Sequence, residues 1–134
     1  MTGSTSANRY LLDTNAFLFF INADRALSAA SKELLESAAT LLISTASLWE
    51  IAIKSSLGKL TLPSSFSEFI PSQLDENEID ILPITLLHIK ELSRLPFHHK
   101  DPFDRLVIAQ SISEKLPVVS SDSAFDLYEI ERIW

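Results

Sequence analysis

Short apolar runs that alternate with helical segments are the feature that most constrains the fold of this chain. The runs at residues 10–12, 41–43 and 117–119 show no alternation of polar and apolar side chains. Strands of this kind are buried on both faces, as in parallel sheets covered by helices. We expect further strands at residues 79–82 and near 130–133. The pattern predicts an α/β fold with a central, mainly parallel sheet.

The segments between these runs have the spacing or the end signals of helices. Residues 26–39 place apolar side chains at the positions of an amphipathic helix. Thr14 or Asn15 is expected to cap a first helix, and Gly58 suits the left-handed residue that ends a helix. The predicted helices cover residues 16–21, 26–39, 44–57, 66–74, 86–95 and 101–115.

The length of 134 residues fits one domain and is too short for two of ordinary size. Residues 1–8 are small and polar, so we expect a disordered tail followed by a single domain over residues 9–134. The sequence has no cysteine, which excludes disulfides and thiolate metal sites and favours a cytoplasmic protein. No apolar run is long enough to cross a bilayer, so we expect no membrane partner.

Composition also excludes several classes of function. The two glycines, Gly3 and Gly58, allow no glycine-rich phosphate loop, dinucleotide fingerprint or hydrolase nucleophile elbow. ATPases, NAD enzymes and serine hydrolases are therefore disfavoured. A net charge of −7 argues against broad electrostatic binding to nucleic acid. That argument fails if several acids share a pocket that binds divalent cations, because bound metal reverses the local field.

Acidic side chains follow two of the predicted strands. Asp13 comes directly after the first strand, and Asp122 follows Val118-Val119 after two serines. Ligands of parallel sheets bind beyond the carboxyl ends of the strands, so we expect both carboxylates at one edge of the sheet. Each residue taken alone is better explained as the N-cap of the helix that follows.

Other acids lie near the starts of predicted helices. Ser47 and Glu50 fit a capping box, yet the apolar residues around Glu50 would bury a carboxylate that then needs a partner. Asp101 is a good N-cap before Pro102. Asp104 lies in the first turn of a mostly apolar helix and is less well explained by capping. We therefore favour Asp104 over Asp101 as a site residue.

Several carboxylates brought together repel one another by several kcal/mol unless a proton or a cation intervenes. A divalent cation is the simplest resolution. The predicted ligands are all oxygen atoms, with no cysteine and no histidine adjacent, which suits Mg²⁺ or Mn²⁺ better than zinc. Such a site can activate water and stabilise an in-line displacement at phosphorus, which is the chemistry of a nuclease.

The strongest basic feature of the sequence is the loop His98-His99-Lys100. Together with Arg105 it is expected to flank Asp104, where it could position the phosphates of an RNA substrate. A solvated loop without any role in binding is the alternative.

Four segments of the chain together resemble PIN-domain toxins of the VapC type. The segments are Leu11-Leu12-Asp13-Thr14-Asn15-Ala16, Ser47-Leu48-Trp49-Glu50-Ile51-Ala52-Ile53-Lys54, His99-Lys100-Asp101-Pro102-Phe103-Asp104-Arg105-Leu106-Val107-Ile108-Ala109-Gln110 and Val119-Ser120-Ser121-Asp122. The resemblance implies a three-layer α/β/α fold and an endoribonuclease that depends on Mg²⁺ or Mn²⁺. It also implies a homodimer and a cognate antitoxin protein that blocks the site.

The resemblance assigns roles to particular positions. It implies a catalytic, metal-binding set of four acids, with polar residues that support it: Asp13, Glu50, Asp104 and Asp122, supported by Thr14, Ser120 and the helix-opening Asp101. Asn15 stands where this subgroup often carries histidine, and Ser120 stands where threonine is common. Neither departure removes a carboxylate.

Two other classes of function stay open. A phosphoacceptor signalling module also keeps acids and Mg²⁺ at its strand ends. Such modules place a pair of acids after the first strand, whereas here Asp13 is followed by Thr14-Asn15. A non-catalytic binding or dimerisation domain would use its acids only as helix caps.

Overall fold

The described residues, 8–38 and 40–134, form one five-stranded sheet in this computed structural model. The strands are β1 (Arg9–Leu12), β2 (Thr40–Ser44), β3 (Ile79–Leu82), β4 (Val118–Val119) and β5 (Arg132–Ile133). They lie in the order β3-β2-β1-β4-β5, and every neighbouring pair is parallel. The predicted α/β fold with a parallel sheet is confirmed, and a strand is present at each predicted place.

Helices connect the strands, as the sequence pattern predicts. They are α2 (Thr14–Ile21), α3 (Ala29–Ser37), α4 (Thr45–Ser56), α5 (Phe66–Glu76), α6 (Leu86–Ser93) and α7 (Pro102–Glu114), with a short 3₁₀ helix, η1 (Ser123–Leu127), before β5. α4 ends where Gly58 adopts a φ of +73°, so the predicted left-handed stop is confirmed.

The caps of two helices differ from the prediction. α2 is capped by Asp13, not by Thr14 or Asn15, because Asp13 Oδ1 accepts a hydrogen bond from the Ala16 amide at 2.7 Å. α3 begins at Ala29, later than predicted, because the Ser28 hydroxyl accepts a hydrogen bond from the Ser31 amide at 3.0 Å. Both corrections follow from the same rule. A residue with an extended backbone and a short polar side chain caps the helix that follows it.

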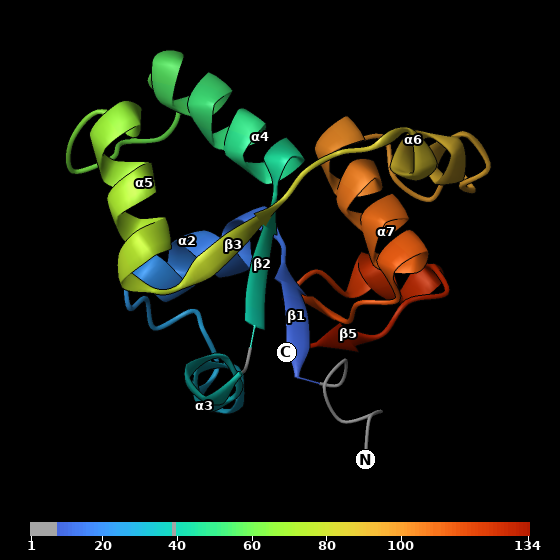
Figure 1. The fold of residues 1–134 in the computed structure, drawn as a ribbon, viewed down its shortest axis with the longest axis horizontal. Helices are drawn as coiled ribbons and strands as arrows, with labels where there is room; N and C mark the ends of the chain where they lie inside the picture. The colour runs from blue at the N-terminus through green and yellow to red at the C-terminus, as the bar shows by residue number, and fades with distance from the viewer. Residues whose placement is uncertain (1–7, 39) are drawn as a thin grey trace.

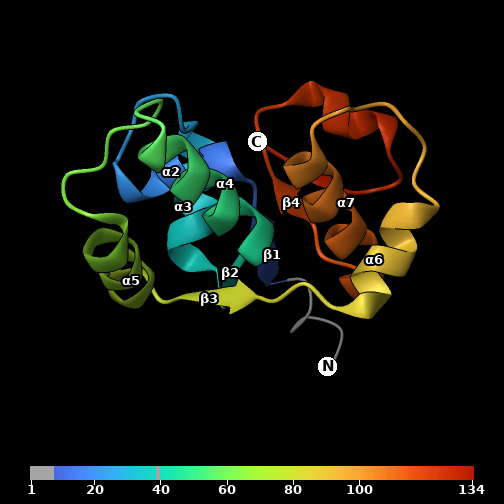
Figure 2. The ribbon, with the colours of Figure 1, turned by 90° about the horizontal axis from the view of Figure 1, so that it is seen from above.

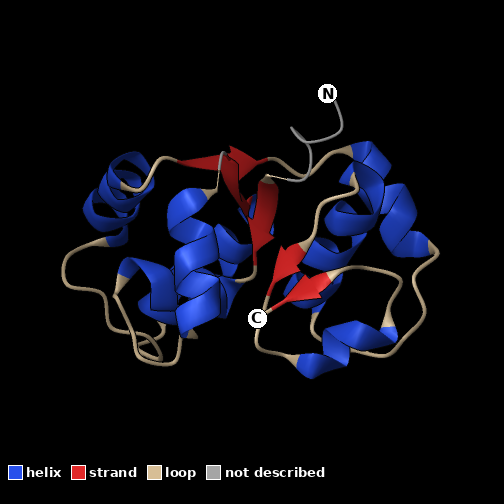
Figure 3. Cartoon of the chain, turned by 90° about the horizontal axis from the view of Figure 1, so that it is seen from below, coloured by secondary structure: helices blue, strands red, loops and turns tan. Residues whose placement is uncertain are grey.

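Helices cover both faces of the sheet. Figures 1 and 2 show α2, α3, α4 and α5 on one side of the strands and α6 and α7 on the other, and Figure 3 shows the strands between the two groups. Side chains of β1 alternate between two cores, because Tyr10 and Leu12 pack with one group of helices and Leu11 packs with the other. The expected three-layer α/β/α arrangement is therefore present.

The strand order fixes where a ligand site can form. From the central strand β1 the chain proceeds to β2 and β3 on one side, and it later returns to β4 and β5 on the other. Connections from β1 therefore run to one side of the sheet first and to the other side later, and the change of side falls between β1 and β4. Open parallel sheets bind ligands at the carboxyl ends of the two strands that flank such a change. The Asp13 amide donates to the Val119 carbonyl at 3.1 Å, which fixes the two strand ends side by side.

Two expectations concern the ends and surface of the molecule. Residues 1–7 of the predicted tail lie outside the described residues, while the Asn8 carbonyl accepts a hydrogen bond from the Thr40 amide at 3.1 Å. Within residues 8–38 and 40–134, no helix has the length and apolarity to cross a membrane.

Candidate active site

Asp13 stands at the carboxyl end of β1 and is buried, with 5% of its surface exposed. One of its carboxylate oxygens caps α2, as described above. Burial is the main cause that raises the pKa of Asp13 to about 6, and the nearby carboxylates of Asp122 and Glu50 raise it further. Hydrogen bonds from Ser120 and the Ala16 amide oppose this rise. The cap and the site therefore use the same residue, so the two interpretations of Asp13 are compatible.

Glu50 reaches the same edge of the sheet from the middle of α4. Its buried carboxylate accepts hydrogen bonds from Thr14 Oγ1 at 2.7 Å and from Lys54 Nζ at 2.7 Å. The capping-box interpretation is wrong, because Ser44 caps α4. Ser47 lies inside the helix, and its buried hydroxyl has no hydrogen-bond partner in the described part of the chain. Glu50 thus has the partners that a buried carboxylate needs.

The two aspartates at the start of α7 have different surroundings. Asp101 is the N-cap, and its Oδ1 accepts hydrogen bonds from the amides of Phe103 at 2.8 Å and Asp104 at 3.0 Å. The carboxyl of Asp104 has a pKa raised to about 7, first by burial and then by Asp101, Glu50, Asp13 and Asp122. Every cause acts in the same direction, so Asp104 faces a concentration of negative charge.

Asp122 follows β4 and caps η1, accepting a hydrogen bond from the Ala124 amide at 3.0 Å. Ser120 lies beside both Asp122 and Asp13, because its buried hydroxyl accepts from the Asp122 amide at 3.0 Å and its interaction with Asp13 lowers the pKa of that carboxyl. Arg132 Nη1 donates to the Ser120 carbonyl at 3.0 Å and so fixes this turn from β5.

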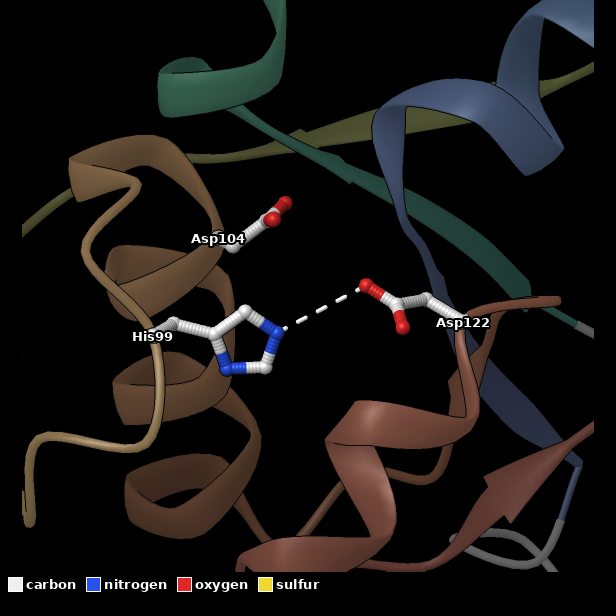
Figure 4. Close-up of side chains that lie close together, drawn as sticks. All are labelled: His99, Asp104 and Asp122. Atoms are coloured by element: carbon white, nitrogen blue, oxygen red, sulfur yellow. Dashed lines mark ion pairs between the residues drawn. The ribbon is translucent and has the colours of Figure 1, made fainter.

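His99, predicted as part of the basic loop that flanks Asp104, lies at the acidic cluster itself. Its Nε2 lies 3.5 Å from Asp122 Oδ2, and Figure 4 shows the ring pointing between Asp122 and Asp104. One ligand atom from each of His99, Asp104 and Asp122 lies within 4.8 Å of the others. The expectation that no histidine is adjacent to the acids is therefore wrong. A contact with Tyr128, 29 residues away in sequence, holds the His99 ring in this place.

The other members of the predicted basic loop differ in exposure. The Arg105 side chain is buried and donates to the carbonyls of Pro96 at 2.8 Å and Leu95 at 3.3 Å. Its guanidinium also lies 4.0 Å from the ring centre of Phe97, so Arg105 holds the loop before α7 rather than offering its charge to a phosphate. His98 and Lys100 are exposed.

The residues present fit a divalent cation. Carboxylate oxygens dominate the donor set, and the charges of Asp101, Glu50, Asp13 and Asp122 all raise the pKa of Asp104, even though Lys54 pairs with Glu50. The buried Nε2 of His99 faces these acids and has no hydrogen-bond partner among the described residues. A cation would resolve the repulsion and satisfy these donors together.

Fold and site together define an α/β protein with a cluster of acidic residues at the carboxyl ends of β1 and β4 in its parallel sheet. A comparison with family models gives the narrower identity, because the PIN domain model matches residues 10–131. The chain belongs to the PIN-domain family. PIN domains are nucleases, so a hydrolase is supported and the phosphoacceptor alternative is disfavoured.

Solved structures with this fold include chains of VapBC complexes. VapBC2 from Rickettsia felis, bound to a DNA fragment from its promoter, matches with a TM-score of 0.69 and 21% identity, covering 93% of this chain and 97% of that chain. DNA-bound VapBC from Salmonella typhimurium matches with a TM-score of 0.66 and 16% identity, covering 93% of this chain and 96% of that chain. A toxin–antitoxin complex from Klebsiella pneumoniae matches with a TM-score of 0.64 and 15% identity, again covering 93% of this chain and 96% of that chain. The resemblance to VapC-type PIN domains is confirmed in the fold. A sequence search among curated proteins finds no match.

Proposed function

We propose that this protein is an endoribonuclease that depends on Mg²⁺ or Mn²⁺ and is the toxin of a toxin–antitoxin pair. The observation that carries the proposal is the convergence of acids from four separate elements on one edge of the sheet. Two of them, Asp13 and Asp104, have pKa values raised to about 6 and about 7. Membership in a nuclease family supports the use of this charge for phosphodiester hydrolysis.

In this proposal Asp13, Glu50, Asp104 and Asp122 hold the cation. A bound divalent cation supplies an activated water and stabilises the charge that develops at the scissile phosphate. The chain itself orients the ligands. Thr14 fixes one oxygen of Glu50, and Ser120 fixes the positions of Asp13 and Asp122 relative to each other.

Lys54 has a part in the charge balance of the site. Its ammonium donates to Glu50 at 2.7 Å, and the pKa of Lys54 is raised by this hydrogen bond, by the charge of Glu50 and by Asp101 and Asp104. The lysine therefore stays protonated and offsets part of the negative charge at one side of the cluster. It leaves the other acids to interact with the cation.

The RNA backbone is proposed to contact the exposed His98 and Lys100 at the start of α7. Only a few basic groups take part, because the whole chain carries a net charge of −7. We therefore expect a shallow dependence of binding on salt, with each phosphate contact contributing a slope of about −0.7 to −0.9. Asp101 positions this loop as the N-cap of α7.

The proposal includes a cognate antitoxin protein and a homodimer. Similar folds occur in VapBC complexes and in a toxin–antitoxin complex, which supports the antitoxin. The homodimer rests on the family resemblance. Light scattering of the purified protein, alone and with a candidate antitoxin encoded beside it, tests both assemblies.

Cleavage of a mixed RNA pool tests the function directly. Purified protein is incubated with Mg²⁺, with Mn²⁺ and with chelator, beside the variants Asp104→Asn and Asp80→Asn. Asp80 is exposed on β3 and lies outside the acidic cluster. The Asp80→Asn variant is therefore a matched control, because it also replaces one carboxylate by an amide. We expect metal-dependent cutting by the parent protein and by Asp80→Asn, and none by Asp104→Asn. Equal cutting by Asp104→Asn, or cutting that survives the chelator, would contradict the proposal.

A further inference from the structure

The His99 imidazole is held in a fixed orientation toward the acids. Its ring stacks on Tyr128 at 5.5 Å between centres with an interplanar angle of 23°, and it meets the Phe125 ring edge-on at 5.4 Å. Only 11% of the side chain is exposed. Packing on two aromatic rings removes the freedom of the imidazole to turn away, so its Nε2 is preorganised at the site.

The hydrogen bonds of His99 identify which nitrogen is available. The Tyr128 hydroxyl lies 3.0 Å from the His99 amide and 3.2 Å from His99 Nδ1. The phenol oxygen accepts from the amide, and when Nδ1 carries the imidazole proton the same oxygen also accepts from Nδ1. Nε2 then carries a lone pair, and this is the arrangement in which metal-bound histidines use one nitrogen for an outer hydrogen bond and the other for the ion.

The Nε2 atom of His99 faces negative charge. Nε2 lies 3.5 Å from Asp122 Oδ2, longer than an ordinary hydrogen bond, and it has no hydrogen-bond partner in the part of the chain that is described. A cation between the two atoms would bind both the Nε2 lone pair and the Asp122 carboxylate. The placement of Nε2 beside Asp122 and Asp104 therefore suits a shared metal ion.

The distances suit a single ion. Donor atoms bound at about 2.1 Å lie at most about 4.2 Å apart across the ion. The ligand atoms of His99, Asp104 and Asp122 lie within 4.8 Å of one another. Small rotations of the two aspartate side chains would bring all three donors to bonding distance.

We propose that His99 is a nitrogen ligand of the catalytic metal ion, together with Asp104 and Asp122. This inference rests on the proposed metal-dependent function and adds a ligand to it. An imidazole donor strengthens the binding of Mn²⁺, Co²⁺ and Ni²⁺ more than that of Mg²⁺, which prefers oxygen. The site is therefore selective for a transition ion rather than for Mg²⁺.

The first test uses the unaltered protein loaded with Mn²⁺. Pulsed electron paramagnetic resonance should detect modulation by a coordinated imidazole nitrogen. The His98→Gln variant, altered at the neighbouring exposed histidine, should keep this signal, and His99→Gln should lose it. Absence of nitrogen modulation in the unaltered Mn²⁺ protein would overturn the proposal, and this readout does not depend on the folding of any variant.

The second test is the affinity for metal, measured by calorimetry at pH 7.5 on the full chain. We expect His99→Gln to weaken Mn²⁺ binding at least about tenfold and Mg²⁺ binding by less than about threefold, with circular dichroism confirming the fold. Equal losses for both ions, or none, would contradict nitrogen ligation. Nitrogen modulation in a protein that cuts no RNA would refute the nuclease proposal and leave His99 as a ligand.

Discussion

Two polar clusters in this molecule are built in opposite ways. In the α6–α7 cluster, made of His88, Gln110 and Glu114, His88 accepts from the Thr85 amide at 3.0 Å and contacts Glu114 at 2.8 Å. In the acidic cluster, made of Asp13, Glu50, Asp104 and Asp122, the neighbours of Asp104 are acids that raise its pKa. In the first cluster both ring nitrogens of His88 have protein partners, a backbone amide and a carboxylate. The second has an excess of one charge, which indicates a site made for a ligand.

The largest expected effect is on catalysis, from Asp13→Asn. Asparagine caps a helix as well as aspartate does, so α2 should keep its start and the protein its fold. The lost charge removes a cation ligand, and cleavage should fall at least about 1000-fold, equivalent to about 4 kcal/mol. Single-turnover cleavage with saturating Mn²⁺ measures it. A loss below about tenfold in the folded variant would remove Asp13 from the site.

The next effect is on stability, from His88→Ala in the α6–α7 cluster. His88 is 1% exposed, and its loss leaves the Thr85 amide and the Glu114 carboxylate without their partner. We expect a loss of about 2–4 kcal/mol in the free energy of unfolding, measured by urea titration, because a cavity and unpaired polar groups both contribute. Metal affinity should be unchanged. The exposed His98→Ala is the control and should stay within about 0.5 kcal/mol.

A smaller effect is the pH dependence of the metal-free protein. The pKa of Asp104 is raised to about 7, so the folded state binds this proton more tightly than the unfolded state does. The corresponding stability is fully present below about pH 4 and is lost as the pH rises through about 7. Since Asp104 is partly exposed, we expect a loss of about 1–2 kcal/mol.

Urea titrations in chelator from pH 5 to pH 8 isolate this contribution. Asp104→Asn removes the titrating group, so the difference in unfolding free energy between variant and parent should grow with pH in favour of the variant. Parallel curves would show that Asp104 does not experience the charge of the other acids.

The smallest effect comes from Thr14→Val. It removes the hydrogen bond of 2.7 Å that holds Glu50 and keeps the shape of the side chain. We expect cleavage to fall about five- to tenfold, equivalent to about 1 kcal/mol. Thr14→Ser keeps the hydroxyl and should restore most of the rate. If serine and valine give equal rates, Thr14 does not position Glu50.

Local patterns predict the layers of this fold well. The apolar runs of β1, β2 and β4 are short and uninterrupted, and burial on both faces leaves few alternatives to a parallel sheet. The carboxyl-end rule then points to Asp13 and Asp122, which the structure places at the same edge. These predictions need only the order of residues along the chain.

Contacts between distant residues explain what the sequence does not reveal. Glu50 resembles half of a capping box until Thr14, 36 residues earlier, is known to donate to it. His99 resembles part of a basic loop until Tyr128 fixes its ring against the acids. Trp49 is predicted beside Glu50 on a buried helix, yet it is 55% exposed and its ring meets Phe103. Each case depends on tertiary packing, which the local spacing of residues does not reveal.

The measurement that tests the central claim most directly is calorimetric titration of the chelator-treated protein with Mn²⁺ at pH 7.5, beside Asp104→Asn. The claim is that the acidic cluster binds a divalent cation. It predicts saturable binding by the parent protein and a rise in melting temperature of about 10 °C, since ligand at about 100 times Kd adds about 2.7 kcal/mol. It predicts at least about tenfold weaker binding by Asp104→Asn. No binding by the parent protein at millimolar Mn²⁺, or equal binding by the variant, would contradict it.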